Sequence, residues 1–195
     1  MNYSEYKVTK ITRGACECFF AKHHYLSQQG NTFRSGYYFG LIHKDKLIAA
    51  TVFNTMSSQI TAKGCFDLAT NDQKGFFEIG RFSIDPDYDT DDLAAWFLKE
   101  SIHRFRSEHE VRALFAYADP AHETGEVYVV AGFTCYGLTA KRRDFYVKQD
   151  DDLYVKQNRG KTAGVDGVWR DRPQKLRFLL NYDESLQTQW EDSRK

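Results

Sequence analysis

The sequence has no apolar run long enough to cross a bilayer, which requires about 20 consecutive apolar residues. Its polar start, MNYSEYKVTK, lacks the apolar core of a secretory signal, and there is no internal repeat or low-complexity tract. We therefore expect an intracellular protein without a membrane partner. The 195 residues, 42% hydrophobic and 15% aromatic, suffice for one domain with a sizeable core and leave little room for a second.

The four cysteines include no CxxC pair, which is the spacing of many redox and zinc motifs. Cys16 and Cys18 are too close in the chain for a comfortable bridge, and an intracellular setting favours free thiols. We expect four ordinary free cysteines, buried or on the surface.

A net charge is also missing, because 27 Lys and Arg balance 27 Asp and Glu, and this at first argues against a nucleic-acid-binding protein. The charges are unevenly spread, however. Residues 141–177 hold eleven Lys or Arg and six Asp, whereas residues 67–100 hold nine Asp or Glu and three Lys or Arg. Opposed patches of this kind still permit a basic binding face.

Hydrophobic periodicity predicts helices and strands in mixed order. A helix begins at Asp91 and Asp92, whose carboxylates suit the positive end of the helix dipole, and presents an apolar stripe along residues 93–105. Residues 111–118 are nearly all apolar, as in a central strand buried on both faces. The other expected elements are strands at 6–12, 37–43, 46–53 and 76–84, helices at 14–26 and 123–131, two strands within 133–147, and an apolar segment at 176–182.

This order predicts an α+β fold, with one central mixed sheet flanked by helices, in a single domain of residues 1–195. Long loops are expected at 55–75 and at 158–173. The basic C-terminal segment, residues 141–182, belongs to the domain, and residues 184–195 are expected to form a loose tail.

Several strings narrow the fold class. A helix that contains a tyrosine and runs into Gly-Phe, EVYVVAGFTCYG, resembles the Gcn5-related N-acetyltransferase (GNAT) fold. The strings KHHYL, EIGRFSID and YADPAHETGEVYVVAGFTCYG are similar to the Mom family of bacteriophage DNA-modification enzymes. The closing RPQKLRFLL resembles that family's basic C-terminal segment, so the resemblance covers roughly residues 8–182.

The resemblance implies a transferase in the cytoplasm of a bacterial host cell. Mom-type enzymes add an acetamido-type group to N6 of adenine in phage DNA and so protect it from restriction nucleases. The implied partners are double-stranded DNA and a small-molecule acyl donor, for which the fold suggests acetyl-CoA. Two other functions stay open: coenzyme-A-dependent acetylation of a small amine or protein, and a non-catalytic binding module that kept the fold.

The sequence departs from the GNAT pattern in the turn that binds the acyl donor. In typical GNAT enzymes a glycine-rich turn after the fourth strand binds the pyrophosphate of coenzyme A through backbone N–H groups. Here that turn has no glycine and contains five carboxylates that repel a pyrophosphate: Asp85, Asp87, Asp89, Asp91 and Asp92. We therefore expect coenzyme A to bind weakly or in an unusual pose.

Two candidate catalytic residues flank the end of the central strand. Asp119 lies at the edge of the sheet where open sheets bind ligands, and could orient an amine or take its proton. The alternative is an aspartate that caps the turn before PAHETG. Tyr128 lies on the next helix, off its expected apolar stripe, where a phenol can act as general acid to a leaving group. The alternative is a half-buried tyrosine with a bonded hydroxyl.

Four further candidates come from the other two motifs. Glu78 and Arg81 are three residues apart on a strand, so they point to opposite faces unless a β-bulge intervenes, as is common in the fourth strand of the GNAT fold. His24 and Tyr25 lie late in the first helix. The Mom resemblance implies an iron site formed by His24, Asp119 and Tyr128, although their spacing contains no metal motif.

The basic segment suggests contacts to DNA. Its Lys and Arg would bind phosphates, and the interspersed Trp169 and Tyr154 could stack on an unpaired base. The alternative is a solvated charged surface. Arg159 and Lys161 belong to this cluster, and the candidate DNA-binding residues are Lys141, Arg142, Arg143, Arg170, Arg172, Lys175 and Arg177.

Overall fold

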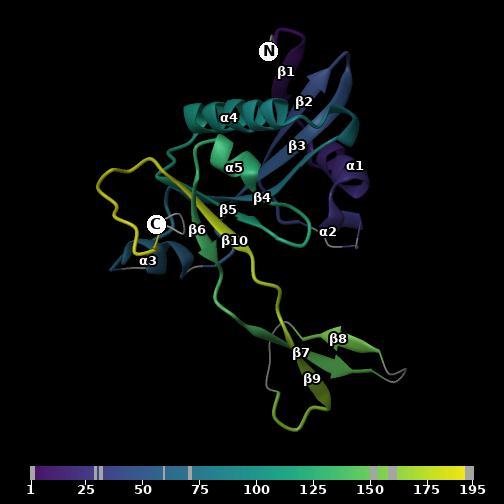
Figure 1. The fold of residues 1–195 in the computed structure, drawn as a ribbon, viewed down its shortest axis with the longest axis vertical. Coiled ribbons are helices and arrows are strands. Elements are labelled where there is room, and N and C mark those ends of the chain that lie inside the picture. The colour runs from purple at the N-terminus through teal and green to yellow at the C-terminus, as the bar shows by residue number, and fades with distance from the viewer. Residues whose placement is uncertain are drawn as a thin grey trace.

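The computed structural model describes residues 3–28, 30, 33–58, 60–69, 72–149, 153–157 and 162–191. Its main sheet has the strand order β1-β2-β3-β4-β5-β10-β6 (Figure 1). Neighbouring strands are antiparallel except β4 and β5, which run parallel, so the predicted α+β fold with a mixed sheet is confirmed. The strands are β1 (Tyr6–Lys10), β2 (Tyr37–His43), β3 (Lys46–Thr55), β4 (Phe76–Ile84), β5 (Ala113–Ala118), β10 (Leu176–Asn181) and β6 (Thr134–Leu138).

Helices cover both faces of this sheet. Alternate residues of a strand point to opposite faces, so Ala49 and Phe53 of β3 pack with α4 (Asp91–Glu108), whereas Ala50 and Val52 pack with α1 (Arg13–His23). The stripe predicted along α4 is buried from Leu93 to Phe105. On the α4 side lies α5 (Glu126–Val130), and α3 (Thr61–Phe66) packs on the opposite side of β5.

Two predicted boundaries were wrong. The helix expected at 14–26 ends at His23, because His24 has an extended backbone (φ −125°, ψ 120°), and α2 (Tyr25–Gln28) starts anew. The loop expected at 55–75 contains α3, which forms because its apolar side chains, among them Ala62, Cys65 and Phe66, are buried against the sheet. A short 3₁₀ helix, η1 (Pro86–Tyr88), follows β4.

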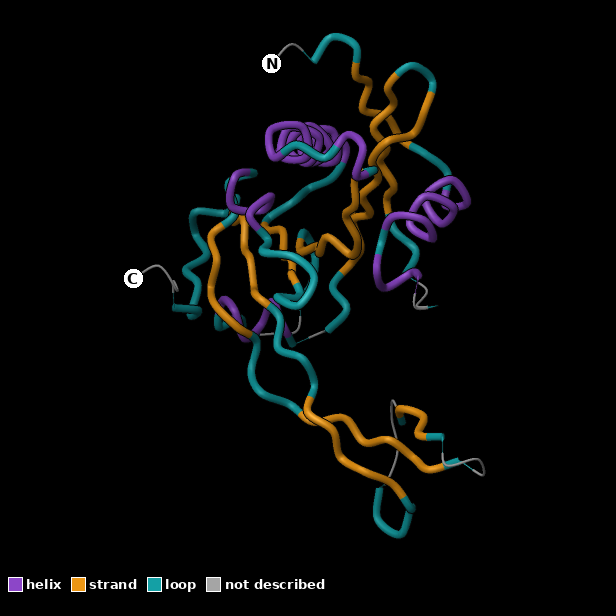
Figure 2. Tube along the Cα trace, turned by 45° about the vertical axis from the view of Figure 1, so that its right-hand side comes forward, coloured by secondary structure: helices purple, strands orange, loops and turns teal. Residues whose placement is uncertain are grey.

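A separate three-stranded sheet, β8-β7-β9, stands clear of the main sheet in both views (Figures 1 and 2). We call it the arm: β7 (Arg143–Lys148), β8 (Tyr154–Lys156) and β9 (Gly167–Asp171). The expected loop at 158–173 was therefore wrong where β9 pairs with β7. Residues 158–161, including Arg159 and Lys161, lie outside the described residues.

Two chain segments, 139–142 and 172–175, form the neck of the arm. The Thr139 N–H donates to the Lys175 carbonyl at 2.8 Å, and the Arg172 N–H donates to the Arg142 carbonyl at 2.8 Å. These paired backbone groups hold the two segments together although neither belongs to a strand.

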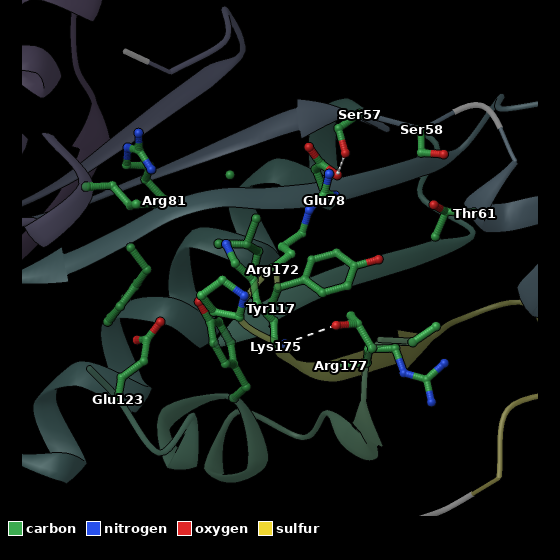
Figure 3. A pocket seen from close by; sticks show the side chains of 18 of the residues that line it. Ser57, Ser58, Thr61, Glu78, Arg81, Tyr117, Glu123, Arg172, Lys175 and Arg177 are labelled. Atoms are coloured by element: carbon green, nitrogen blue, oxygen red, sulfur yellow. Dashed lines mark hydrogen bonds between the residues drawn. The ribbon is translucent and has the colours of Figure 1, made fainter. Parts of the chain in front are cut away.

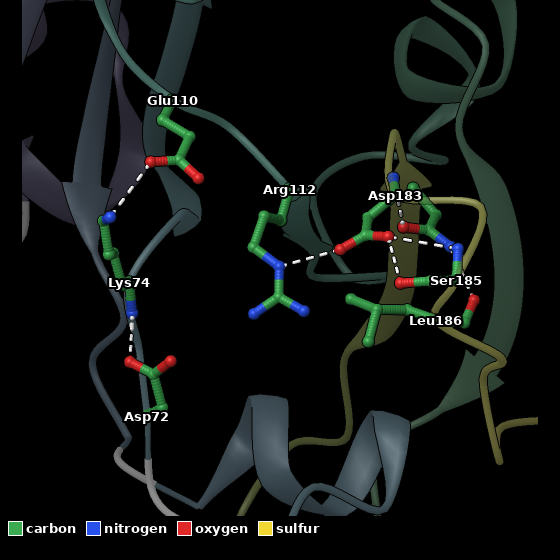
Figure 4. A network of polar contacts seen from close by, with 8 residues as sticks. Asp72, Lys74, Glu110, Arg112, Asp183, Ser185 and Leu186 are labelled. Atoms are coloured by element: carbon green, nitrogen blue, oxygen red, sulfur yellow. Dashed lines mark hydrogen bonds and ion pairs between the residues drawn. The ribbon is translucent and has the colours of Figure 1, made fainter.

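The expectation of a loose tail was wrong for residues 184–191. Arg112 anchors the start of this segment through Asp183, with 2.8 Å between Nε and Oδ2 (Figure 4). Farther along, the Trp190 ring packs against Phe115 and Tyr136, because covering an apolar sheet face with an indole is energetically favourable. Residues 192–195 lie outside the described part of the chain.

The four cysteines are free, as expected. Burial raises the pKa of the Cys16 thiol to about 12 and that of the Cys65 thiol to about 11, so both are inert side chains of the core. No helix within the described residues is long and apolar enough to span a membrane.

A β-bulge interrupts β4 at Gly80. Val52 of β3 pairs with Arg81, but the next residue, Phe53, pairs with Ile79, so Gly80 is an extra residue on β4. A Cβ atom at Gly80 would lie 1.8 Å from Oδ1 of Asn54. Asn54 itself is buried and donates to the carbonyls of residues 34 and 35 at 3.0 and 2.8 Å, so it has little freedom to move.

The bulge therefore makes a stability prediction. Gly80→Ala should lower the free energy of unfolding by about 1–3 kcal/mol, because the methyl group overpacks a buried site. Gly64→Ala is the matched control: nothing lies within 4 Å of its added Cβ in α3, and alanine should stabilise the helix by about 0.5–1 kcal/mol. Denaturant unfolding of the two variants measures both values, and equal stabilities would contradict the close packing at Gly80.

Candidate active site

The parallel strands β4 and β5 separate soon after they begin. Only Phe76–Glu78 of β4 pair with Ala113–Phe115 of β5, and the bulge follows two residues later. A cavity of about 600 Å³ opens at this point, lined by side chains from both sides of the gap (Figure 3). Its position follows from the strand geometry, because the separated strands leave the interior of the sheet accessible.

Glu78 and Arg81 both line this cavity. The extra residue Gly80 shifts the alternation of side chains, so the condition under which both were expected in one pocket is met. Both side chains are buried, with 7% and 6% of their surface exposed. Oε2 of Glu78 accepts from the Ser57 hydroxyl at 2.8 Å, and Oε1 lies 3.4 Å from Nη1 of Arg34.

His24 and Tyr25 line the cavity because the helix breaks between them and α1. Nδ1 of His24 accepts from the Leu26 N–H at 3.2 Å, which leaves Nε2 as the protonated nitrogen. Burial, with the nearby charges of Arg81 and Lys175, lowers the pKa of His24 to about 4, so the imidazole is neutral at pH 7. Burial likewise raises the pKa of Tyr25 to about 12.

Tyr128 enters the cavity from the opposite side, on α5. Its ring packs against Phe178 and Phe133, with centroids 5.2 and 5.7 Å away, and burial raises its pKa well above the ordinary value. The expected inward stripe of this helix was wrong at Val130, which is exposed, whereas Tyr128 is buried.

Asp119 is not among the side chains that line this cavity. Its Oδ1 accepts from the Ala121 N–H at 3.1 Å, and its carbonyl accepts from the N–H groups of His122 and Glu123 at 2.8 and 2.9 Å. Asp119 therefore caps the turn after β5, which is the alternative that the sequence left open.

Glu123 is a cavity residue that sequence reasoning missed. It lies in the Asp119 turn, and Figure 3 shows its carboxyl group directed into the cavity. Burial raises the pKa of Glu123 to about 7, an effect that the backbone of Asp119 and the charge of Lys175 partly oppose. Its place just after a buried central strand was a usable signal, because ligands bind at that edge of open sheets.

A second cavity, of about 510 Å³, lies beyond the bulge and is lined by β4 from Phe82 to Ile84 and by the chain from His122 to Val127. His24, Tyr25 and Glu123 line both cavities. The two spaces therefore meet at an uncharged imidazole, a phenol and a carboxyl group that titrates near neutral pH. This arrangement could bind two reactants and move a proton between them.

The acidic turn after β4 does not fit a coenzyme A pyrophosphate. Three of its backbone N–H groups are already bonded within the chain: that of Asp87 to Oδ1 of Asp85, that of Tyr88 to the Asp85 carbonyl, and that of Asp89 to the Pro86 carbonyl. Oδ2 of Asp85 is held by Nζ of Lys46 at 2.8 Å. The N-cap of α4, Thr90, accepts from the Leu93 N–H at 3.3 Å.

The iron site implied by the resemblance does not fit either. Asp119 is turned toward its own loop, and Nδ1 of His24 already accepts from the backbone. Across the described ranges, no three His, Cys, Asp or Glu side chains are grouped so that they could hold a metal ion.

The candidate DNA-binding residues fall into two groups. Arg172 and Arg177 are engaged within the protein: Nε of Arg172 lies 3.0 Å from Oδ2 of Asp144, and Nη2 of Arg177 donates to the Tyr136 carbonyl at 2.7 Å. Lys175 lines the larger cavity. Lys141, Arg142, Arg143 and Arg170 are exposed, and so is Arg172 despite its contact with Asp144.

The fold is that of GNAT acetyltransferases. It is similar to the ribosomal-protein-S5-alanine acetyltransferase from Vibrio fischeri (TM-score 0.54, 13% identity, 94% of this chain and 97% of that one). It is also similar to the ribosomal-protein-S18-alanine N-acetyltransferase from Escherichia coli (TM-score 0.51, 13% identity, 90% of this chain and 93% of that one). A third similar structure is a GNAT family acetyltransferase from Elizabethkingia anophelis with acetyl-CoA bound (TM-score 0.51, 12% identity, 91% of this chain and 99% of that one).

Within this fold the family can be given. The family model of the Mom protein family matches residues 5–177, so the chain belongs to the Mom protein family. No curated protein matches the sequence.

The cavity predicts an unusual titration. Among the glutamates, one should titrate near pH 7 in carboxyl-carbon NMR, and its signal should disappear in Glu123→Gln. Lys175→Met should raise this pKa further, because Lys175 favours the ionised carboxylate. A Glu123 signal that titrates near the ordinary value of about 4.3 would contradict the burial of this group.

The acidic turn after β4 should repel the phosphates of acetyl-CoA, so we predict that this donor binds weakly. Calorimetry should detect no tight, stoichiometric complex with acetyl-CoA. Asp87→Asn with Asp92→Asn should strengthen whatever binding there is, most clearly at low salt, because two exposed like charges are removed. A tight complex with the unaltered protein would show that the turn tolerates a pyrophosphate.

Proposed function

We propose that this protein is a transferase that adds an acetamido-type group to N6 of adenine in double-stranded phage DNA, in the cytoplasm of a bacterial host. The observation that carries the proposal is the meeting of two cavities at His24, Tyr25 and Glu123, in a member of the Mom protein family. Protection of the DNA from restriction nucleases would follow, because the altered base no longer presents its normal edge.

The larger cavity would receive the base. N6 of adenine lies inside the base stack, so the nucleotide must be flipped out before it can react. The cavity volume, about 600 Å³, falls in the usual range for small-molecule sites. Glu78 and Arg81, both buried and both polar, would fix the orientation of the base through its hydrogen-bonding edge.

The smaller cavity would hold the donor, and two residues would move the protons: Glu123, which is shared by the two cavities, and Tyr128, which lines the larger one. Glu123 would take a proton from N6 as the new bond forms, since a carboxyl group with a pKa of about 7 can act as a base at neutral pH. Tyr128, which stays protonated, would give its proton to the leaving group. Asp119 would act by positioning Glu123 through the turn that it caps.

The fold also supports a second candidate, coenzyme-A-dependent acetylation of a small amine or protein, because a structurally similar GNAT acetyltransferase has acetyl-CoA bound. The bonded N–H groups and the carboxylates of residues 85–92 oppose it. A non-catalytic binding module, the third candidate, gives no reason for a glutamate with a raised pKa between two cavities.

The test is mass spectrometry of nucleosides from the DNA of cells that express the protein. The wild type should produce a heavier deoxyadenosine, and Glu123→Gln and Tyr128→Phe should reduce it by about 100-fold or more, the usual contribution of a general acid or base. Glu184→Gln, the same chemical change at an exposed site, should leave it unchanged.

Unmodified nucleosides from cells with verified soluble wild-type protein would overturn the proposal. Full modification by both catalytic variants would instead remove Glu123 and Tyr128 from the mechanism. Thermal melts of each variant exclude unfolding as the cause of a lost product.

A further inference from the structure

The two faces of the arm differ, and the register of β7 and β9 defines them. Phe145 lies opposite Trp169 and Arg143 lies opposite Asp171, so these four side chains share one face. Their neighbours along the strands, such as Val168, point to the other face, because side chains alternate. We call the first the tryptophan face.

The tryptophan face and the neck together form a shallow basin of about 730 Å³. Lys141, Arg142 and Arg143 supply exposed cations, and Asp171 is the one carboxylate among the described residues that line the basin. Asp171 lies 3.8 Å from Arg143, and both side chains are largely exposed, so this ion pair is weak and open to exchange.

Trp169 lines the basin and is 49% exposed. One part of the indole packs on Phe145, with ring centroids 5.2 Å apart, which fixes its orientation. An indole exposed to water is less stable than a buried one, so folding alone does not explain this position. An exposed tryptophan with a fixed orientation, surrounded by cations, suits the binding of a flat aromatic ligand.

The basin adjoins the larger active-site cavity, because Arg142 and Arg172 line both spaces. Arg172 is fixed there by Asp144, whose carboxylate also binds Nζ of Lys156 at 2.7 Å. These contacts, led by the Arg172 hydrogen bonds, lower the pKa of Asp144 to about 2, so the wall between the spaces keeps its charges throughout the physiological range.

We propose that this basin binds the nucleotide next to the target adenine, with Trp169 stacked on its base and with Lys141, Arg142 and Arg143 on its flanking phosphates. The inference rests on the proposed function, because it places the neighbouring nucleotide relative to the base in the cavity. Stacking on an indole suits a base that has lost its stacking partner when the target is flipped out, and phosphates supply the complementary negative charge.

The proposal is tested with a fluorescently labelled DNA duplex that contains adenines, by anisotropy at several salt concentrations. Trp169→Ala should weaken binding about 10-fold, within the range known for loss of one base–aromatic stack, and Trp169→Phe should restore most of it. Val168→Ala is the control: it truncates the adjacent side chain of the same strand on the opposite face, and should bind as the wild type does.

Lys141→Ala should weaken binding differently from Trp169→Ala. It should reduce the slope of log affinity against log salt concentration by about 0.9, the value for one phosphate contact, whereas Trp169→Ala should leave the slope unchanged. A duplex with 2-aminopurine beside the target adenine gives an independent readout, because stacking on Trp169 should quench its fluorescence in the wild type and not in Trp169→Ala.

Wild-type binding by both Trp169→Ala and Lys141→Ala, with DNA still modified in cells, would overturn the basin proposal and leave the proposed function standing. A wild-type protein that modifies no DNA and binds no duplex would overturn both. The thermal melt of each variant is measured, so that unfolding is excluded as the cause of weakened binding, because Trp169 packs on Phe145.

Discussion

The extra residue in β4 is the constraint on which the site depends. Because Gly80 has no side chain, Asn54 occupies the position that a Cβ atom at residue 80 would take. The bulge at Gly80 also turns Glu78 and Arg81 toward the same cavity. The same region is where β4 stops pairing with β5, so the sheet opens beside two buried polar side chains. Without the bulge, one of these side chains would face the opposite side of the sheet, and the cavity would lose one of these two buried, charged groups.

The electrostatics of the cavity follow from this opening. His24 and Glu123 are buried beside the separated strands, and burial is the main cause that shifts the pKa of each group toward its neutral form. Lys175 limits the rise in the pKa of Glu123, and Arg81 and Lys175 enlarge the fall in that of His24, because a positive charge favours a carboxylate and disfavours an imidazolium. The neutral imidazole of His24, the protonated phenol of Tyr25 and the titrating carboxyl group of Glu123 lie together where the two cavities meet, and such groups can transfer protons. The chain belongs to the Mom protein family and has the fold of GNAT acetyltransferases.

The sequence predicted those features that depend on local periodicity, such as the stripe of α4 and the buried strand β5, since both follow from the spacing of apolar residues. It also predicted Glu78 and Arg81 in one pocket, given a bulge. It could not predict the pKa of Glu123, which comes from side chains distant in the chain. Strand β7 of the arm was expected within residues 133–147, but β8 and β9 were missed because these short strands are stabilised by pairing with β7, which has no periodic signal in the sequence. The tail was misjudged because the apolar face that Trp190 covers exists only in the folded protein.

The most direct test of the account is a crystal structure of Glu123→Gln bound to a short adenine-containing duplex. The substitution removes the proposed proton acceptor and keeps the size of the side chain, so the complex should accumulate without reaction. The account predicts one adenine outside the helix, in the space between β4 and β5, with N6 beside residue 123. A duplex with every adenine stacked, or with its extruded base bound away from Glu78 and Arg81, would contradict it.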